Sequence, residues 1–176
     1  MMRSSRFLPA LSGLLVPLAL LPSQAALAAC EPVTEALVRL AQTPSHQYTT
    51  SSLPGLDTKP SEVVITGATM WLLVDGRWRS LPYDARKRIA EMKRSTAEAS
   101  AAARGSCARV RHEAGGGEPA TLYKVHDATD AGIVDSQIWI SAAHGLALHQ
   151  VVDILETDSY LDSRFDYANV RPPATH

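Results

Sequence analysis

Six histidines, a C-terminal group of acids and two cysteines are the residues of this sequence whose chemistry could serve a reaction. A zinc protease would place two histidines one helical turn apart beside a glutamate, and no His-Glu-x-x-His pattern is present. No Gly-x-Ser-x-Gly or Ser-x-x-Lys pattern indicates a serine nucleophile. We therefore expect no metal site and no cofactor, and we interpret as surface residues His46, His112, His126, His144, His149 and His176.

The acids near the C-terminus are the second group with chemical potential, because paired carboxylates catalyse glycoside hydrolysis. The alternative is that they lie along the last strands and keep them soluble and unpaired with neighbouring molecules. No catalytic role can be assigned to groups beside them, so we expect a protein that is not an enzyme. A hydrolase is the weakest alternative, and it would use Asp153, Glu156, Asp158, Asp162 and Asp166.

The N-terminus has the order of a secretory signal peptide, which is a positive start, an apolar stretch and small residues. Arg3 and Arg6 supply the charge, residues 7–21 are mainly apolar and uncharged, and small residues precede a cleavage site after Ala28. The apolar stretch is shorter than a membrane-spanning helix requires. We therefore predict a signal peptide over residues 1–28, export to the periplasm, and a single domain over residues 29–176.

Cys30 and Cys107 are the only two cysteines, and an oxidising compartment favours a disulfide between them. The rival interpretation is that residues 27–30 resemble the lipobox of bacterial lipoproteins, in which the cysteine is lipidated. Lipidation would anchor the protein through Cys30 and leave Cys107 as a free thiol. The polar break at residues 22–24 favours the disulfide, and the protein would then contact membranes only transiently.

Composition excludes several other classes of protein. The 176 residues are 45% hydrophobic and 20% charged, which is typical of a globular protein and not of a disordered chain. Seventeen basic and eighteen acidic side chains leave no basic field that could hold phosphates, so we expect no nucleic-acid partner. Composition does not indicate an oligomeric state.

Two helices are expected in the mature chain. Glu31-Pro32 can open the first, and Thr43-Pro44 can end it, because the residue before a proline avoids the helical conformation. Asp84 can cap a second helix that runs to about Ala103, with Gly105 beyond it. The apolar stripe of this second helix is thin, so we expect a lightly held element that acts as a movable lid.

The remaining segments have the character of β-strands. Asp75-Gly76 between two apolar runs predicts a type I′ hairpin, because both central residues need positive φ. Glycines 115–117 join two β-like runs and precede no helix, so they predict a turn and not a phosphate-binding loop. Helix, strands, helix, strands is the order of an α+β fold with a mainly antiparallel sheet. The expected strands are 46–52, 61–66, 69–74, 77–81, 108–112, 120–126, 133–140, 146–155 and 160–170.

Several of these strands are apolar on both faces, as in 70–74 and 148–155, whereas a sheet with one wet face would alternate. The two helices can cover the second face, and incomplete cover would leave an apolar cavity. The alternative for each inward residue is an ordinary place in a filled core. Alternation selects as inward candidates Val63, Ile65, Trp71, Leu73, Tyr123, Val125, Ile138, Ile140, Leu148 and Val152.

An ordered series of segments resembles the LolA-like superfamily of bacterial periplasmic proteins, which includes lipoprotein carriers and related lipid-binding proteins. The series consists of Trp71 to Trp78 around Asp75-Gly76, Ile138-Trp139-Ile140-Ser141 with Gly145-Leu146-Ala147-Leu148, and Phe165-Asp166-Tyr167-Ala168-Asn169-Val170. The resemblance covers nearly the whole predicted domain. It implies a curved, unclosed antiparallel half-barrel packed against an N-terminal and a mid-chain helix, with a cavity for acyl chains. No ligand residue of a carrier matches a specific position here.

The sequence thus predicts a non-enzymatic periplasmic protein that binds a lipid, an acyl chain or the lipid moiety of a lipoprotein in an apolar cavity. Its partner would be a lipid or a lipidated protein. Burial of an acyl chain would supply the affinity, at about 0.8 kcal/mol per CH₂ group. The alternative is an envelope protein-interaction or structural module with a filled core and no ligand.

Overall fold

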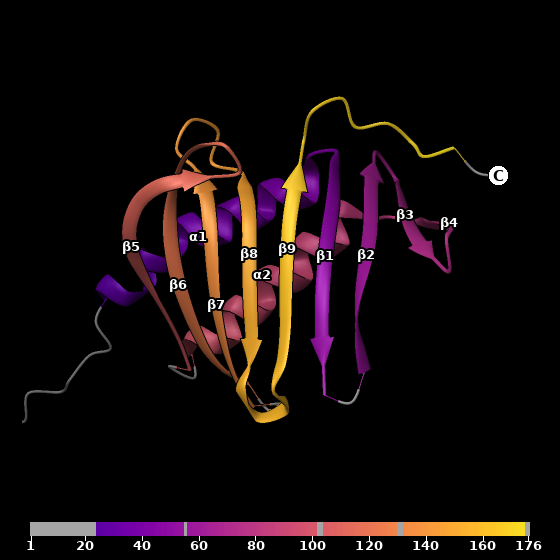
Figure 1. Cartoon of the computed structure of the whole chain (residues 1–176). Helices are drawn as coiled ribbons and strands as arrows, with labels where there is room; N and C mark the ends of the chain where they lie inside the picture. Colours follow the sequence, from indigo (N-terminus) through magenta and orange to yellow (C-terminus); the bar gives the residue numbers. More distant parts are fainter. Residues whose placement is uncertain (1–23, 55, 102–103, 130–131, 175–176) are drawn as a thin grey trace, which may run out of the picture.

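The structure is a computed structural model that describes residues 24–54, 56–101, 104–129 and 132–174 (Figure 1). Its helices are α1 (Gln24–Gln42), α2 (Ala85–Ala101) and the 3₁₀ helix η1 (Leu155–Thr157). Its strands are β1 (Ser45–Leu53), β2 (Leu56–Thr66), β3 (Thr69–Val74), β4 (Arg77–Pro82), β5 (Gly105–Gly115), β6 (Glu118–Thr129), β7 (Gly132–Ser141), β8 (Ala147–Ile154) and β9 (Ser159–Asp166).

All nine strands form one sheet in the order β4-β3-β2-β1-β9-β8-β7-β6-β5, and every neighbouring pair is antiparallel. β4 and β5 do not pair with each other, so the sheet is open, and it curves most strongly at β5 (Figure 1). Both α-helices lie behind the sheet in Figure 1 and contact each other. The predicted α+β fold, with an unclosed antiparallel sheet and two helices, is confirmed.

The turns are those that the sequence predicts. Asp75 and Gly76 have φ values of 51° and 73°, as a two-residue turn between β3 and β4 requires. Gly116 and Gly117 also have positive φ, at 60° and 88°, and join β5 to β6. The Asp84 carboxylate accepts a hydrogen bond from the Lys87 backbone N–H at 3.0 Å, which is the predicted N-terminal cap of α2.

Several elements differ from the expected boundaries. β2 begins before the expected residue 61, and β5 and β6 extend beyond both of their expected ends. α1 and β9 also differ. α1 begins at Gln24, so Pro32 lies inside the helix and does not open it. The reason is the alanine-rich stretch at 25–29, since alanine is the strongest helix former. The helix therefore includes the end of the predicted signal peptide, whose residues 1–23 lie outside the described part of the chain. β9 ends at Asp166, where the side chain accepts a hydrogen bond from the Ala168 N–H at 2.8 Å.

The hydrophobic core lies between α1 and the strands β7 and β8. Val33 and Ala36 on α1 pack against Ile138, Ile140 and Ala147, and all five side chains are buried. Residues three apart share one face of a helix, which is why Val33 and Ala36 meet the sheet together. Partly buried side chains complete the cluster, namely Leu37, Tyr123, Val125 and Phe165.

A disulfide joins Cys30 on α1 to Cys107 on β5, with Cα atoms 5.0 Å apart and a sequence separation of 77. The bridge fixes α1 to the edge of the sheet, which it also contacts directly. The bonded sulfur of Cys30 has no valence left for a lipid thioether, so this structure favours the disulfide over the lipobox interpretation. A disulfide is typical of proteins outside the cytoplasm.

We expect the variant Cys30→Ala/Cys107→Ala to lose about 2–5 kcal/mol of unfolding free energy, because its unfolded chain is no longer cross-linked. Urea unfolding with and without reductant measures this. Reductant should destabilise the wild type by a similar amount and leave the variant unchanged. Equal stability of the oxidised wild type and the variant would show that the bridge does not constrain the chain.

Candidate ligand-binding cavity

A half-open cavity of about 940 Å³ lies between the two helices and the sheet. That volume lies within the range of small-molecule sites, which is about 300–1,000 Å³. Its walls come from both helices, from β1, β2, β3, β4 and β8, and from the segments that flank β3 and α2. The lining residues are Leu37, Leu40, Ala41, Gln47, Val63, Ile65, Ala68, Met70, Pro82, Tyr83, Asp84, Lys87, Arg88, Glu91, Met92 and Gln150.

Strand register brings the floor of the cavity together. Ile65 pairs with Met70 on β3, and Val63 pairs with Gln47 on β1. Directly paired residues of antiparallel strands project to the same face, and successive residues alternate. The helix side of the sheet therefore carries Val63, Ile65, Met70 and Gln47 together, beneath Leu37 of α1.

α2 covers the cavity on the side opposite the sheet and forms its roof, and few of its described side chains pack against the rest of the protein. No described side chain of α2 is fully buried, which agrees with its thin apolar stripe. The Tyr83 hydroxyl, just before α2, donates a hydrogen bond to the Ala41 carbonyl of α1 at 3.0 Å. Burial raises the pKa of Tyr83, and the nearby Arg88 guanidinium offsets part of that rise. This bond ties the end of α1 to the start of α2 at the rim of the cavity.

Polar groups gather where α2 borders the cavity. Lys87 and Arg88 contribute two positive charges, and Asp84 and Glu91 contribute two negative charges. The floor opposite them is made mainly of aliphatic side chains and Met70. A lining that is apolar on one side and charged along its border suits an amphiphile, whose tail leaves water while its polar head stays hydrated.

The ten candidate inward residues do not share one site in the structure. Val63 and Ile65 line the cavity. Ile138 and Ile140 are buried in the core, and Tyr123 and Val125 pack against it. Val152 also faces the helices. It is paired with Ser136, and Ser136 lies on the same face of β7 as the buried Ile138, two positions along the strand.

Trp71 and Leu73 lie on the other face of the sheet. Trp71 is paired with Val64, which neighbours the cavity-lining Val63 and Ile65 in the chain and therefore points away from them. The indole Nε1 of Trp71 is buried and has no hydrogen-bond partner among the described residues. Leu148 sits at a register shift between β7 and β8, beside Gly116. The alternation pattern found these positions but did not fix the face to which each one points.

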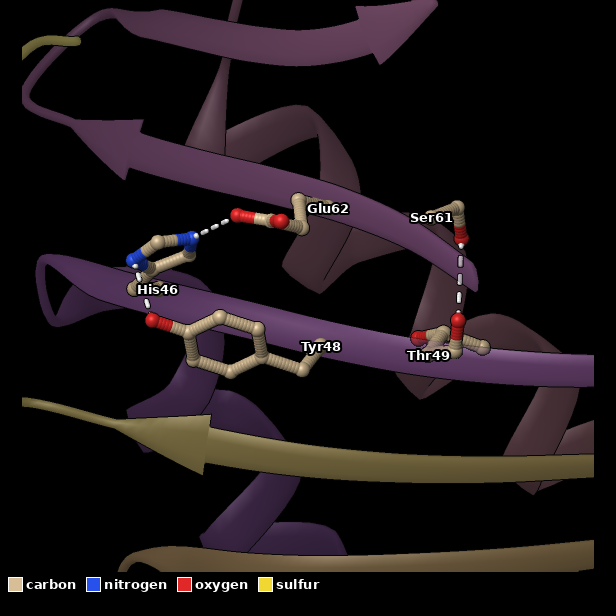
Figure 2. A network of polar contacts seen from close by, with 5 residues as sticks. All are labelled: His46, Tyr48, Thr49, Ser61 and Glu62. Carbon is tan, nitrogen blue, oxygen red and sulfur yellow. Dashed lines mark hydrogen bonds and ion pairs between the residues drawn. The ribbon is translucent and has the colours of Figure 1, made fainter. Parts of the chain in front are cut away.

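Histidine, tyrosine and carboxylate side chains form a polar network on the face of the sheet opposite the helices. Figure 2 shows His46 between Glu62 and Tyr48. His46 Nε2 is 2.9 Å from a Glu62 carboxylate oxygen, and His46 Nδ1 is 2.9 Å from the Tyr48 hydroxyl. A proton on Nε2 of His46 satisfies both contacts, because Nδ1 then accepts from the Tyr48 hydroxyl. The His46 and Tyr48 rings also stack, with centroids 4.1 Å apart. The pKa of Tyr48 is raised, first by burial and then by the carboxylates of Glu62 and Asp166.

A second network lies on the same face over β5 to β9. Trp139 stacks on His149 with centroids 4.5 Å apart, and His149 Nε2 is 2.8 Å from an Asp162 carboxylate oxygen. The Trp139 indole N–H and the Arg111 guanidinium each donate to Glu113 at 2.6 Å. These two hydrogen bonds lower the pKa of Glu113, with that from Arg111 the larger cause. Neither network was predicted from the sequence, because the partners lie up to 26 residues apart.

Three further polar candidates have structural partners. Glu156 accepts a hydrogen bond from the Ile133 N–H at 2.6 Å, and His126 lies 2.6 Å from Asp135. His112 lies 3.0 Å from the hydroxyl of Thr121. His176 is outside the described residues. Within the described ranges, no group of three or more His, Cys, Asp or Glu side chains could hold a metal ion. Nor is any helix there long and apolar enough to cross a membrane.

No protein-family model and no curated protein matches this chain. Among solved structures, MucB in complex with MucA(peri) matches with a TM-score of 0.52 and 12% identity. The fold of this chain is similar to that of MucB. The match covers 83% of this chain but only 57% of the MucB chain, and at this identity it shows the fold alone.

Two further solved structures match with lower TM-scores. LprF from Mycobacterium bovis is 14% identical, with a TM-score of 0.43, and the match covers 87% of this chain and 98% of LprF. A LolA superfamily protein from Nitrosomonas europaea is 8% identical, with a TM-score of 0.28 and coverages of 85% and 94%. A LolA superfamily protein is thus among the matched structures, but both of these TM-scores lie below 0.5, so the similarity of fold rests on MucB.

We expect Tyr83→Phe to lower the unfolding free energy by about 0.5–1.5 kcal/mol, because the Ala41 carbonyl loses its donor. Amide hydrogen exchange in α2 should become faster, since the bond holds the start of that helix. Tyr160→Phe is the control, because its hydroxyl bonds to Asp162 at an exposed site on β9. Unchanged protection of α2 in Tyr83→Phe would show that this contact does not hold the roof.

Proposed function

We propose that this protein binds a lipid, or the lipid moiety of a lipoprotein, with an acyl chain in the cavity between α1, α2 and the sheet. The observation that carries the proposal is the 940 Å³ cavity itself, whose floor is aliphatic. A fold with a filled core would have closed this space with side chains, since protein interiors are close-packed. The similarity of fold to MucB and the LolA-like resemblance are consistent with a binding role but supply no ligand.

Affinity in this proposal comes from the removal of methylene groups from water. Each buried CH₂ contributes about 0.8 kcal/mol, so about ten of them supply about 8 kcal/mol before the costs of ordering. Val63, Ile65 and Met70 on the floor and Met92 on α2 provide the apolar contacts. Met92 suits this role because an unbranched thioether side chain adapts to chains of different shape.

Access to the cavity in this proposal depends on α2. Its described side chains are half-buried or exposed, so its displacement costs little buried surface. The Tyr83 contact to Ala41 would remain as the hinge side, and the charged border would keep the polar head of the ligand in water. The protein would act outside the cytoplasm, after removal of residues 1–28, and without catalysis.

A second candidate function is protein binding in the cell envelope. It is favoured by one observation on a protein of similar fold, namely that MucB was solved in complex with MucA(peri). The aromatic and histidine networks on the open face would then be part of the binding surface, since tyrosine, tryptophan and arginine are enriched in interfaces. The two candidates differ in whether the cavity is occupied.

Val63→Gln tests the lipid proposal, because it places an amide in the floor of the cavity. We expect it to weaken binding of a fluorescent long-chain fatty acid by about tenfold or more, since the amide loses hydration against an acyl chain. Val151→Gln is the matched control, because Val151 is a half-buried valine on the opposite face of the same sheet. The control should bind the probe as the wild type does.

Native mass spectrometry of the exported protein gives the complementary measurement. Lipid that co-purifies with the wild type and is reduced in Val63→Gln supports the proposal. Absence of any bound amphiphile, together with equal probe affinity in both variants, would overturn it and leave the protein-binding candidate.

A further inference from the structure

The sheet ends at β4, and the outer edge of this strand pairs with no other described strand. The direction of its backbone groups follows from one hydrogen bond just beyond the strand, from the Tyr83 N–H to the Ala68 carbonyl at 2.8 Å. Inward and outward pairs alternate along an antiparallel ladder. The backbone groups of Trp78 and Ser80 therefore point away from β3, and no described residue accepts or donates a hydrogen bond there.

The side chains of β4 present a different chemistry on each face. Arg77 and Arg79 project to the helix side, since Arg79 is paired with Leu72, and both are exposed. Neither forms an ion pair with a described carboxylate. Trp78 projects to the open face, where it is half-buried and its ring lies 6.2 Å from that of His46. The outer edge of β4 thus has unpaired backbone N–H and C=O groups. On the helix side it carries Arg77 and Arg79, which form no ion pair with a described carboxylate, and on the open face it carries the Trp78 indole.

The other edge of the sheet is occupied. β5 contacts α1, is joined to it through the Cys30–Cys107 disulfide, and has a register shift between Arg109 and Arg111. A bulge of this kind interrupts an edge and discourages further pairing. Arg111 is also neutralised by Glu113 within the same strand. β4 has a regular register, no such ion pair, and no bulge.

We propose that β4 is a docking edge for an extended acidic segment of a partner protein, which adds to the sheet as a further strand. The backbone of the segment would bond to the N–H and C=O groups of Trp78 and Ser80. Asp or Glu at alternate positions would face Arg77 and Arg79, and apolar residues between them would pack beside Trp78. Pro82 lacks an N–H and ends the available ladder, so the contact is short.

Charge argues against a second copy of this chain as the occupant. If Trp78 pairs with Ser80 of a second β4, Arg79 lies opposite Arg79 of that copy. If Trp78 pairs with itself, Arg79 lies opposite Arg77. Like charges directly opposite each other destabilise a strand pair, whereas carboxylates at those positions stabilise it.

The test uses the full exported protein and two labelled synthetic peptides, one of alternating Asp and Val and one of alternating Lys and Val. We expect fluorescence anisotropy to show binding of the Asp peptide that weakens with salt, and at least about tenfold weaker binding of the Lys peptide. Arg77→Glu/Arg79→Glu should reverse that preference. These two arginines are exposed, so the exchange leaves the fold intact, which thermal unfolding verifies.

Ser80→Pro removes the outward N–H while Ser80→Ala keeps it. We expect the proline variant to bind the Asp peptide about tenfold more weakly, and the alanine variant to bind within about twofold of the wild type. Val63→Gln should leave peptide binding unchanged, which separates this site from the proposed lipid cavity.

Three results would overturn the proposal. The first is no binding of the Asp peptide. The second is that the charge-reversed variant binds each of the two peptides with the same affinity as the wild type does. The third is a concentration-dependent dimer in size-exclusion chromatography that Ser80→Pro abolishes, which would make a second copy the occupant. If Ser80→Pro does not fold, the charge reversal decides the question by itself.

Discussion

The packing of α1 against β7 and β8 is the interaction on which the rest of this structure depends. Val33 and Ala36 place one end of the helix over Ile138, Ile140 and Ala147, and the disulfide at Cys30 fixes the same end to β5. The other end of α1 carries Leu37, Leu40 and Ala41 out over β1 to β3. Among the described residues no comparable cluster of buried side chains forms there, so the space between helix and sheet becomes a cavity and not a continuation of the core.

α2 completes the cavity without closing it. It borders a half-open space with a charged margin, and its attachment includes the Tyr83 hydrogen bond to Ala41. The same helix would bury a sheet face permanently if its apolar stripe were wider. Its weak amphipathicity is therefore what leaves the aliphatic floor accessible, and a floor of this kind favours a ligand that gains by leaving water.

The opposite face of the sheet is stabilised by specific polar contacts. His46 with Glu62 links β1 to β2, and His149 with Asp162 links β8 to β9, where a second layer would otherwise be needed. These contacts shield apolar residues such as Val64, which is only 3% exposed although no helix covers it. A single sheet can therefore keep one face toward solvent and still present a rigid aromatic surface next to the edge at β4.

The sequence by itself determined the local features. The φ requirements of Asp75-Gly76 and the glycines at 115–117, the Asp84 cap and the nearly exact limits of β3 and β4 follow from neighbouring residues alone. The pairing of the two cysteines follows from their number and from the predicted export. The predicted start of α1 is wrong, because the helix propensity of the alanines before Pro32 outweighs the preference of proline for the first helical position.

Only the tertiary structure decided which side chains share a site. Val63 and Ile65 meet Leu37 and Met92 across the cavity, while Trp71, an equally apolar candidate, points to the other face. Alternation defines two sets of residues on each strand but not which set faces the helices. That choice is made by the register of strands far apart in the chain and by where α1 packs, and both depend on the sum of all contacts.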